Sequence, residues 1–504
     1  MNMDASRYHH LLSTNDEPLD IEAAEFRKII AQRESDLSNL QTRISELQGM
    51  LLSLIEQRTR EENTLFLVKA VVSPIRRLPQ DILIEIFLFT REWRRDYRLT
   101  GDFRSPPIGP LPRPSPLVVT HTCSEWRRIA LSTPILWATI IRDYNDYHPS
   151  VPSSGPTHDE RLHAWLARTG TQCHLDITLT GTPMYERRPG LPLSFLGPYM
   201  HRIKLLELSE RLCDLPSGSF DVLETLNLTN YALDFGANTD HPIFPSLRRL
   251  LLHEYEELDA PPFISWKQLT HLFLGGYSID SEVFRFILSQ STALIKLYVS
   301  FSEIDIGGTR PREENIVMPY LETLILNDSV EWVFSWLTLP RLTTLSITPF
   351  LGSSVLLFCS FRSRSSFALE SLTLGEGDQM ATSDLFDLIR QMPSLKEIVF
   401  DTIIAVTPML ISGLASPDVL PNVEYLQLRS YDGGAPVIED AILRMIASRD
   451  SSGSPAVVEP NFPKGTRVFR SHRPKRQSIG EVISTVLREV PSYDTDKETI
   501  HIFF

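Results

Sequence analysis

A six-residue pattern, L-x-x-L-x-L, recurs between residues 200 and 430, and it limits the possible folds more than any other feature of this chain. Ten occurrences begin at residues 203, 223, 247, 269, 294, 321, 342, 369, 395 and 423, so successive steps run from 20 to 28 residues. Such regular recurrence indicates stacked structural units, because a single unit of this size cannot bury its own apolar face.

Alternation inside the pattern predicts one short strand in each unit, with two apolar side chains on the same face. Segments between the strands, such as residues 281–290 and 383–392, have helical spacing and would cover the outer side. A period of 20 to 29 residues with this pattern is typical of leucine-rich repeats. We therefore expect an α/β fold, a leucine-rich-repeat solenoid of parallel strands with outer helices, over residues 159–430.

The two ends of this array are expected to be irregular, because end units cap a stack of repeats. At the first end, residues 159–170 read as a helix that ends at Gly170, and residues 174–179 as an irregular first strand. The C-terminal cap would span residues 431–504, with a helix at 440–449, a strand at 467–472 and a helix at 478–490.

The fifth residue of each segment should point to the concave face of the array, opposite the core leucines. Four consecutive residues at this position are apolar or aromatic: Leu251, Phe273, Tyr298 and Ile325. Exposed patches of this kind often mark binding sites, so we predict that this stripe contacts a substrate protein. The alternative, that a loop or tail covers the stripe or that the register is locally different, stays open.

The N-terminal part of the chain predicts one long helix over residues 21–72, which contain no proline and a single glycine. Apolar residues alternate at spacings of three and four through residues 26–54, which is the a/d pattern of a coiled coil. Arg33 occupies one d position, and the pattern breaks at Arg58 and Glu61 before it resumes weakly at residue 65. Residues 26–54 could form a homodimer, or the helix could pack on its own chain. Residues 1–20 are expected to be disordered.

A second, shorter helix follows Pro79, which suits a first helical turn because its missing N–H costs nothing there. Its apolar residues cover more than half of the circumference. One face holds Leu78, Ile82, Leu83, Ile86 and Phe87, while Ile84 and Leu88 lie on the far side. A helix with this much apolar surface is buried on two sides, by its own domain and by something else.

Residues 91–116 are rich in proline and predict an exposed loop, since proline suits neither a helix interior nor a central strand. After the loop, apolar residues from Val118 to Ala130 recur at helical spacing and predict one helix, which Pro134 would end. Leu136 and Trp137 then begin an extended segment.

These segments carry a resemblance. Leu78-Pro79, Ile82, Ile86-Phe87, then Cys123-x-x-Trp126-Arg127-x-Ile129-Ala130 and Pro134-x-Leu136-Trp137 resemble an F-box over residues 73–140. More narrowly, the chain is similar to the F-box-like proteins of mushroom-forming fungi, which combine a heptad helix, this entry, a Pro-rich insertion and this exit. The long insertion departs from the plain F-box pattern and leaves the course of the middle helix open.

The resemblance implies three small helices that bind the Skp-type adaptor of cullin–RING ubiquitin ligases. It assigns adaptor binding to Leu78, Pro79, Ile82, Leu83, Ile86, Phe87, Leu117, Trp126 and Trp137, with the two tryptophans nearer the internal packing.

Composition and charge limit the partners and the cellular compartment that the sequence predicts. The net charge of −14 over 504 residues argues against nucleic acid as a partner. Four scattered cysteines suggest a reducing compartment, the cytoplasm or the nucleus. The first twenty residues lack the apolar core of a signal peptide, and no apolar run approaches the ~20 residues of a membrane helix. The basic segment 467–476 reads as a solvated end of the array.

Catalytic motifs are missing from the sequence. It has no C-x-x-C pair, no phosphate-binding G-x-x-x-x-G-K-[ST] loop and no G-x-S-x-G turn. His158 and His163 are five residues apart, so one helical face cannot direct both toward a metal. We therefore expect a protein without enzymatic activity, metal or cofactor. The prediction is a substrate-recognition subunit of an SCF-type ubiquitin ligase, and the alternative is a leucine-rich-repeat scaffold with no ligase role.

Overall fold

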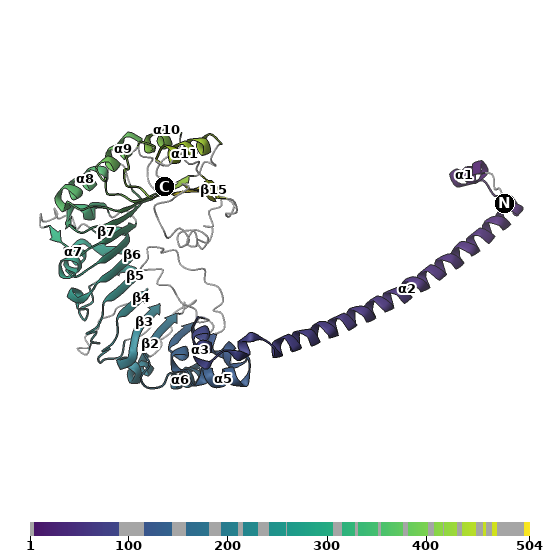
Figure 1. Ribbon diagram of the computed structural model, residues 1–504, viewed down its shortest axis with the longest axis horizontal. Coiled ribbons are helices and arrows are strands. Elements are labelled where there is room, and N and C mark those ends of the chain that lie inside the picture. The colour runs from purple at the N-terminus through teal and green to yellow at the C-terminus, as the bar shows by residue number, and fades with distance from the viewer. Residues whose placement is uncertain are drawn as a thin grey trace. The chain divides into compact units, whose positions relative to one another are not determined.

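The chain is an α/β protein with a long N-terminal helix and a large, mostly parallel sheet (Figure 1). The computed structural model divides into two compact units, Met1–Ile86 and Phe87–Phe504. It describes residues 5–89, 115–143, 158–180, 193–209, 215–229, 241–258, 260–305, 315–327, 331–350, 354–375, 382–401, 408–416, 418–430, 436–449, 457–459, 466–470 and 498–503.

The first unit is helical. Its elements are α1 (Ala5–Ser13), α2 (Asp20–Val71), the 3-10 turn η1 (Pro74–Arg77) and the start of α3 (Gln80–Phe89). Residues 5–13, part of the segment expected to be disordered, form α1. The hydroxyls of Ser13 and Thr14 both donate to the backbone oxygen of His10, at 3.0 and 2.9 Å, which closes the last turn of α1.

The predicted long helix is confirmed as α2. At its start the carboxylate of Glu22 accepts a hydrogen bond from the backbone N–H of Leu19 at 2.9 Å, which satisfies one of the donors that every helix N-terminus leaves open. At its end Pro74 begins η1, since proline cannot continue an α-helix. No helix in the described ranges has both the length and the apolar content to cross a membrane.

The second unit contains the sheet. Its helices are α4 (Ser115–Thr120), α5 (Ser124–Leu131), η2 (Pro134–Trp137), α6 (His158–Arg168), η3 (Leu193–Arg202), η4 (Trp266–Gln268), α7 (Ser281–Gln290), η5 (Glu331–Ser335), α8 (Ser354–Ser365), α9 (Thr382–Arg390), α10 (Pro408–Leu414) and α11 (Pro436–Arg449). Its strands are β1 (Thr139–Asp143), β2 (Leu175–Thr180), β3 (Ile203–Ser209), β4 (Thr225–Thr229), β5 (Arg249–Leu258), β6 (His271–Asp280), β7 (Lys296–Asp305), β8 (Ile316–Val317), β9 (Thr323–Asn327), β10 (Leu337–Thr338), β11 (Thr344–Thr348), β12 (Ser371–Gly375), β13 (Glu397–Asp401), β14 (Tyr425–Ser430), β15 (Val457–Glu459), β16 (Thr466–Arg470) and β17 (Glu498–Phe503).

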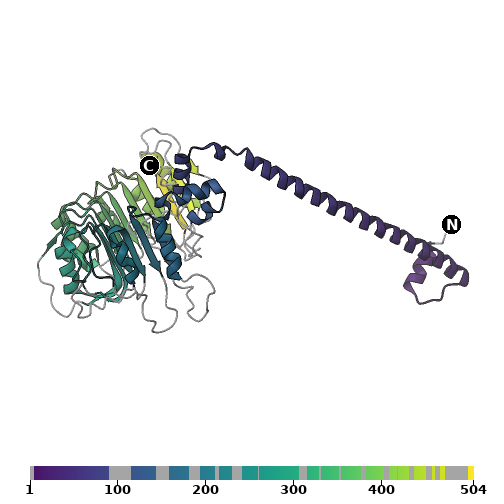
Figure 2. The same cartoon turned by 90° about the horizontal axis from the view of Figure 1, so that it is seen from below.

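Fifteen described strands form one sheet in the order β1-β2-β3-β4-β5-β6-β7-β9-β11-β12-β13-β14-β17-β16-β15. All neighbours are parallel except β14 with β17 and β15 with β16. Strands β8 and β10 make a separate parallel pair. Figure 2 shows the strands side by side, with the helices α7 to α11 along the outer face seen in Figure 1.

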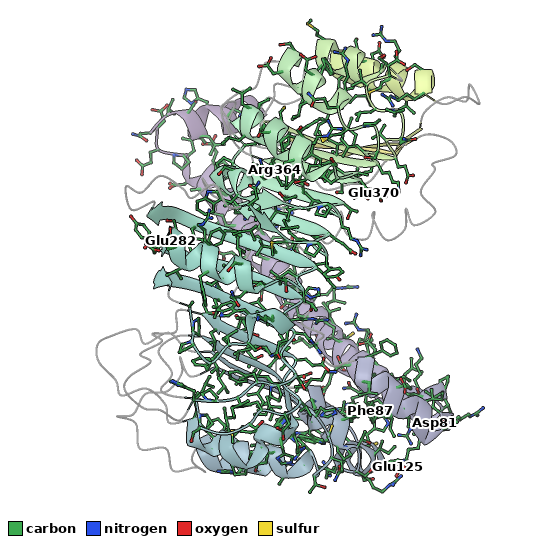
Figure 3. The ribbon with its side chains drawn as sticks, turned by 90° about the vertical axis from the view of Figure 1, so that its left-hand side faces the viewer. Asp81, Phe87, Glu125, Glu282, Arg364 and Glu370 are labelled. Carbon is green, nitrogen blue, oxygen red and sulfur yellow. The ribbon has the colours of Figure 1, made fainter. Side chains whose placement is uncertain are left out.

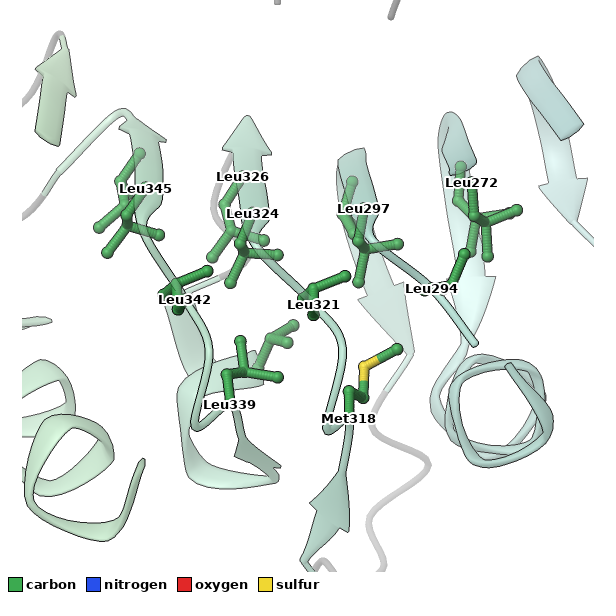
Figure 4. Close-up of a cluster of buried hydrophobic side chains, with 14 of the residues drawn as sticks. Leu272, Leu294, Leu297, Met318, Leu321, Leu324, Leu326, Leu339, Leu342 and Leu345 are labelled. Atoms are coloured by element: carbon green, nitrogen blue, oxygen red, sulfur yellow. The ribbon is translucent and has the colours of Figure 1, made fainter. Parts of the chain in front are cut away.

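Each of the ten six-residue segments supplies one strand of this sheet, so the predicted strands are confirmed. Apolar residues at the first, fourth and sixth positions point toward the helices. Leu321, Leu324 and Leu326 are all fully buried in the main core, as are Leu342 and Leu345 of the next segment. Figure 4 shows these leucines stacked from strand to strand.

The same backbone joint connects successive segments. The carbonyl oxygen of the second residue in one segment accepts hydrogen bonds from the second and third N–H groups of the next. The oxygen of Glu224 accepts from Arg248 and Arg249, and the oxygen of Arg248 accepts from Thr270 and His271. The arrangement repeats up to Lys396, whose oxygen accepts from the segment that begins at residue 423. It satisfies the backbone groups just before each strand begins.

Three arginines, Arg202 buried and Arg364 and Arg449 half-buried, tie neighbouring repeats together on the helix side. The guanidinium of Arg202 donates to the carbonyl oxygens of Gly170 and Cys173 at 2.7 and 2.9 Å. Arg364, labelled in Figure 3, donates to carbonyl oxygens of Phe334 and Leu337. Arg449 donates to three carbonyl oxygens, those of Leu414, Ser416 and Leu420. Each arginine reaches back about thirty residues and replaces water at carbonyls that the helices leave without partners.

Both ends of the sheet differ from expectation. The predicted strand at residues 174–179 is present as β2, but it is not the first strand of the sheet. Strand β1 precedes it in the chain and pairs with it in parallel. At the other end, β17 returns antiparallel to β14, and β16 pairs with β17. The predicted strand at 467–472 corresponds to β16, whereas the predicted helix at 478–490 and most of the basic segment 467–476 lie outside the described residues, as does nearly all of the Pro-rich loop.

Candidate functional site

The helical segment after the Pro-rich loop contains two helices instead of the one that the spacing predicted. Helix α4 ends at Thr120, and α5 begins at Ser124. Between them Cys123 adopts an extended conformation, with φ −158° and ψ 170°, and its Sγ accepts the N–H of Trp126 at 3.4 Å. The thiol therefore acts as the N-cap of α5. Helical spacing continues through such a break, so the pattern could not reveal it.

Tryptophans hold this segment against the first strands of the sheet. Trp137 is fully buried, and its Nε1 donates to the backbone oxygen of Ala130 at 2.8 Å. Trp165 on α6 in turn donates its Nε1 to the backbone oxygen of Trp137 at 2.8 Å, and the two rings meet edge to face at 4.8 Å. The guanidinium of Arg168 lies 4.8 Å from the Trp137 ring. These contacts fix η2 and β1 on α6.

Phe87, in the second half of α3, belongs to the same packing. Its ring lies 4.9 Å from the ring of Trp126 on α5, and only 1% of its surface is exposed. Figure 3 labels Phe87 at this helical end of the unit. Glu125 and Arg128, on the outer side of α5, form an exposed ion pair at 2.6 Å. The hydrogen bond from Arg128 lowers the pKa of Glu125.

The nine residues to which the resemblance gives adaptor contacts fall into three groups. Leu83, Phe87 and Trp137 are buried, Leu78, Ile86 and Trp126 are half-buried, and Pro79, Ile82 and Leu117 are exposed. For Leu83 and Phe87 the assignment to a binding surface needs correction, whereas the burial of Trp137 agrees with its prediction as a residue of the internal packing. Side chains with this little exposed surface fill the protein's own core and cannot touch a partner while the fold is intact.

Of the exposed apolar side chains on these helices, Ile82 was among the predicted adaptor residues, whereas Leu131 and Ile135 were missed by the sequence reasoning. On α3, Phe89 leaves 78% of its surface exposed and Ile82 leaves 44%. In the segment from α4 to η2, the exposed members are Val118, Leu131 and Ile135. Helical spacing marks only the side of a helix that faces its own core, so residues on the opposite side needed the structure to be recognised.

The second predicted surface is the central row of the sheet. Register pairs Leu251 with Phe273, Phe273 with Tyr298, and Tyr298 with Ile325, as the sequence predicted. These residues form a small apolar cluster of their own, separate from the main core. The row continues in register through Ser346, Thr373, Val399 and Gln427.

The expectation that this stripe is exposed was wrong for three of its four residues. Leu251, Phe273 and Tyr298 expose between 2% and 7% of their surface, and Ile325 is half-buried. The rings of Phe273 and Tyr298 stack at 4.2 Å with an interplanar angle of 12°, and the ring of His253 meets that of Phe273 at 5.5 Å. Packing across the strands therefore removes much of the surface that spacing alone would leave open.

Polar groups border the buried stripe on both sides. On one side Thr229 Oγ1 and His253 Nε2 are 2.6 Å apart, and the amide of Asn327 donates to the hydroxyl of Tyr298. At the start of the row, Asn227 is nearly buried, and its Oδ1 accepts no hydrogen bond from the part of the chain that is described.

On the other side, Arg249, His271 and Lys296 are neighbours in the sheet register. Burial, together with the positive charges of Arg249 and Lys296, lowers the pKa of His271 from 6.5 to about 4. Arg249 is exposed, and Lys296 is half-buried. Because His271 stays neutral at pH 7, the positive charge of this border comes from the arginine and the lysine.

Within the described ranges no three His, Cys, Asp or Glu side chains gather in a way that would hold a metal ion. The candidate sites described above are the helical segment from α3 to η2 and the central row of the sheet. Compared with known proteins, the chain matches no protein-family profile and gives no significant match to any curated protein sequence.

Proposed function

We propose that this protein is the substrate-recognition subunit of a cullin–RING ubiquitin ligase of the SCF type, working in the cytoplasm or the nucleus. In this proposal residues 73–140 act as an F-box that binds a Skp-type adaptor, and the repeats act as a leucine-rich-repeat array that binds a target protein. The observation that carries the proposal is α3, which buries Leu83 and Phe87 yet leaves 44% of Ile82 and 78% of Phe89 exposed.

An apolar helix with one side in the core and the other side open is what an adaptor-binding helix requires. Ile82 and Leu117 would supply direct contacts to the adaptor, since both are exposed members of the motif. Phe87 and Trp137 would have an indirect role, because their burial holds α3 and η2 in place. Apolar anchors that are exposed in the free protein and buried in the complex provide most of the binding energy at such interfaces.

The protein itself would carry out no chemistry. Its contribution would be proximity, because holding a target beside the linked enzymes replaces a bimolecular encounter with an intramolecular one. Regular strands at a mean step of about 24 residues, with helices on the outer face, support the leucine-rich-repeat assignment.

Binding of the adaptor is tested by co-purifying the full chain with a Skp-type adaptor. We expect wild type to bind, and Ile82→Asp and Leu117→Asp each to weaken binding at least tenfold without changing the circular dichroism spectrum. Leu356→Asp is the matched control, because Leu356 is an exposed leucine on α8 and should bind normally.

Two results would contradict the proposal. A folded wild-type chain that does not bind the adaptor would favour a protein-binding scaffold with no ligase role. Undiminished binding by both Ile82→Asp and Leu117→Asp would show that the adaptor does not use this surface.

The target would bind the accessible continuation of the central row. Thr373 and Val399 are half-buried members of that row beyond the buried stripe, and side chains there can meet a partner without unfolding the sheet. Proximity labelling in cells should therefore give a set of labelled proteins that Thr373→Arg and Val399→Arg deplete and that Leu356→Asp leaves unchanged. An identical set with all three variants would exclude this part of the sheet as the target surface.

A further inference from the structure

Within the described residues of the first unit, nothing covers the apolar seam of α2. Seven apolar residues at a and d positions each expose between 53% and 62% of their side chains: Ile30, Leu37, Leu40, Ile44, Leu47, Leu51 and Leu54. Single exposed leucines are ordinary on protein surfaces, but seven apolar residues at a and d positions of one helix, interrupted only by Arg33, are not. The second possibility left open by the sequence, that this helix packs its seam on its own chain, has no support within the described residues of the first unit.

The spacing of the seam decides what kind of surface can cover it. A stripe that repeats every 3.5 residues fits another helix that supercoils around it, with each seam side chain inserted between four residues of the partner. A flat sheet or a short helix would cover only part of a stripe that runs over 25 residues, a length of ~36 Å.

We propose that α2 pairs with α2 of a second copy of this chain as a parallel, in-register coiled coil. The protein would then be a homodimer that carries two copies of every downstream surface. The inference does not depend on adaptor binding, because it uses only residues of α2.

Charged residues within the seam favour a second copy in parallel register. Arg33 and Glu61 stand at d positions, and Arg58 stands at an a position. In a parallel, in-register pair each a or d residue lies beside the same residue of the second copy, and each such pair of residues forms one layer of the seam. Every leucine or isoleucine of the seam therefore meets an apolar residue. An antiparallel pair sets a against d, and Arg33 would then face an isoleucine or leucine in nearly every alignment, which removes water from a charged side chain against an apolar layer.

The charged layers of the parallel pair also balance. Positions e and g flank the seam in a coiled coil, so Glu34 of one copy would lie beside Arg33 of the other. Arg58 and Glu61 occupy neighbouring layers, and the two copies together place two positive and two negative charges there. Polar residues of this kind fix the register of a coiled coil while they reduce its stability.

Positions e and g add apolar contact toward the C-terminal end of the seam. Met50 at g and Ile55 at e are both exposed, and in a parallel pair Met50 of one copy faces Ile55 of the other. This contact extends the seam beside Leu51 and Leu54.

The oligomeric state is tested with the purified full chain by sedimentation equilibrium at micromolar concentration. We expect twice the mass of one chain for wild type and the mass of one chain for the double variant Ile44→Glu, Leu47→Glu. The matched control Thr42→Glu, Ser45→Glu adds the same charges beside the seam and should stay dimeric. All four replaced side chains are exposed, so each variant should retain the helix, which circular dichroism checks.

Orientation is tested by oxidative cross-linking. Ile30→Cys should form a disulfide between the two copies of residue 30, identified by mass spectrometry of the linked peptide. An antiparallel pair that aligns the two seams over residues 30–54 would separate the two copies of residue 30 by ~36 Å and would instead link Ile30→Cys chains to Leu54→Cys chains. A monomeric wild-type mass, a dimer that survives Ile44→Glu, Leu47→Glu, or a link between residues 30 and 54 would each overturn the proposal.

Discussion

Trp137 offers the sharpest test of how the helical segment is held on the sheet. Replacing Trp137 with Ala removes a fully buried indole, its hydrogen bond to the backbone oxygen of Ala130, and its edge-to-face contact with Trp165. Truncation of a buried tryptophan typically costs 3–5 kcal/mol of unfolding free energy, because the lost apolar contact and the cavity left behind add together. We therefore expect Trp137→Ala to cost about 4 kcal/mol.

Trp137→Phe separates the hydrogen bond from the packing. The phenyl ring keeps much of the apolar contact, but the oxygen of Ala130 loses the indole donor and keeps the N–H of Thr133 at 3.3 Å, for a cost of about 1–2 kcal/mol. Both variants are measured by urea titration followed by circular dichroism. Tyr277→Ala is the control, because Tyr277 is an exposed aromatic residue and its truncation should change stability by less than ~0.5 kcal/mol.

The two variants together can refute the reasoning. A cost below ~1.5 kcal/mol for Trp137→Ala would mean that the tryptophan cluster does not hold this segment. An equal cost for the Ala and Phe variants would assign the whole effect to the Nε1 hydrogen bond instead of the ring packing.

Three further predictions concern polar groups in the sheet unit. The unfolded chain protonates His271 near pH 6.5 but the folded chain only near pH 4, so stability should fall between these values as the pH is lowered. Solvent screening limits this loss of unfolding free energy to ~1–2 kcal/mol. Urea titrations at pH 7 and 4.5 should show a loss for His271→Gln that is smaller than the wild-type loss by this amount. Arg449→Met removes the donor from the carbonyl oxygens of Leu414, Ser416 and Leu420 and should cost about 3 kcal/mol of unfolding free energy, measured by urea titration. A cost under ~1 kcal/mol would contradict the view that Arg449 holds neighbouring repeats together. Asn227→Leu removes an acceptor without a partner and should leave stability unchanged or raise it by about 1 kcal/mol in the same assay, whereas a loss would reveal a partner for Asn227.

Spacing predicted the strands and their register because each segment repeats the same contacts. Leu223, Leu247 and Leu269 open successive segments, and all three are fully buried. A one-residue slip would turn such leucines away from the core, so the pattern fixes which residues are neighbours across the sheet. This is why the row from Leu251 to Ile325 could be aligned before the structure was known.

Other features depend on contacts that no local pattern contains. The burial of Phe273 arises from its stack on Tyr298, whose position in sequence is 25 residues away. The antiparallel return of β17 joins residues far apart in the chain. Helix α8 was not predicted, because polar residues interrupt its apolar ones, although Phe358 and Phe361 are buried in the core. For the predicted adaptor residues, helical spacing identified the apolar face of α3. It could not show that Ile82 is exposed and Leu83 is buried.

The backbone joint between segments has a consequence for how the array can change length. The joint uses main-chain atoms at the same positions of every segment from Glu224 to Tyr425, so it does not depend on which side chains occupy those positions. Removing or duplicating one whole unit would reconnect an equivalent oxygen with equivalent N–H groups, while the connecting stretches absorb differences in length. Gene segments that encode single repeats can therefore be lost or gained over evolution while the remaining repeats keep the same fold. This provides a physical route to arrays with different numbers of repeats.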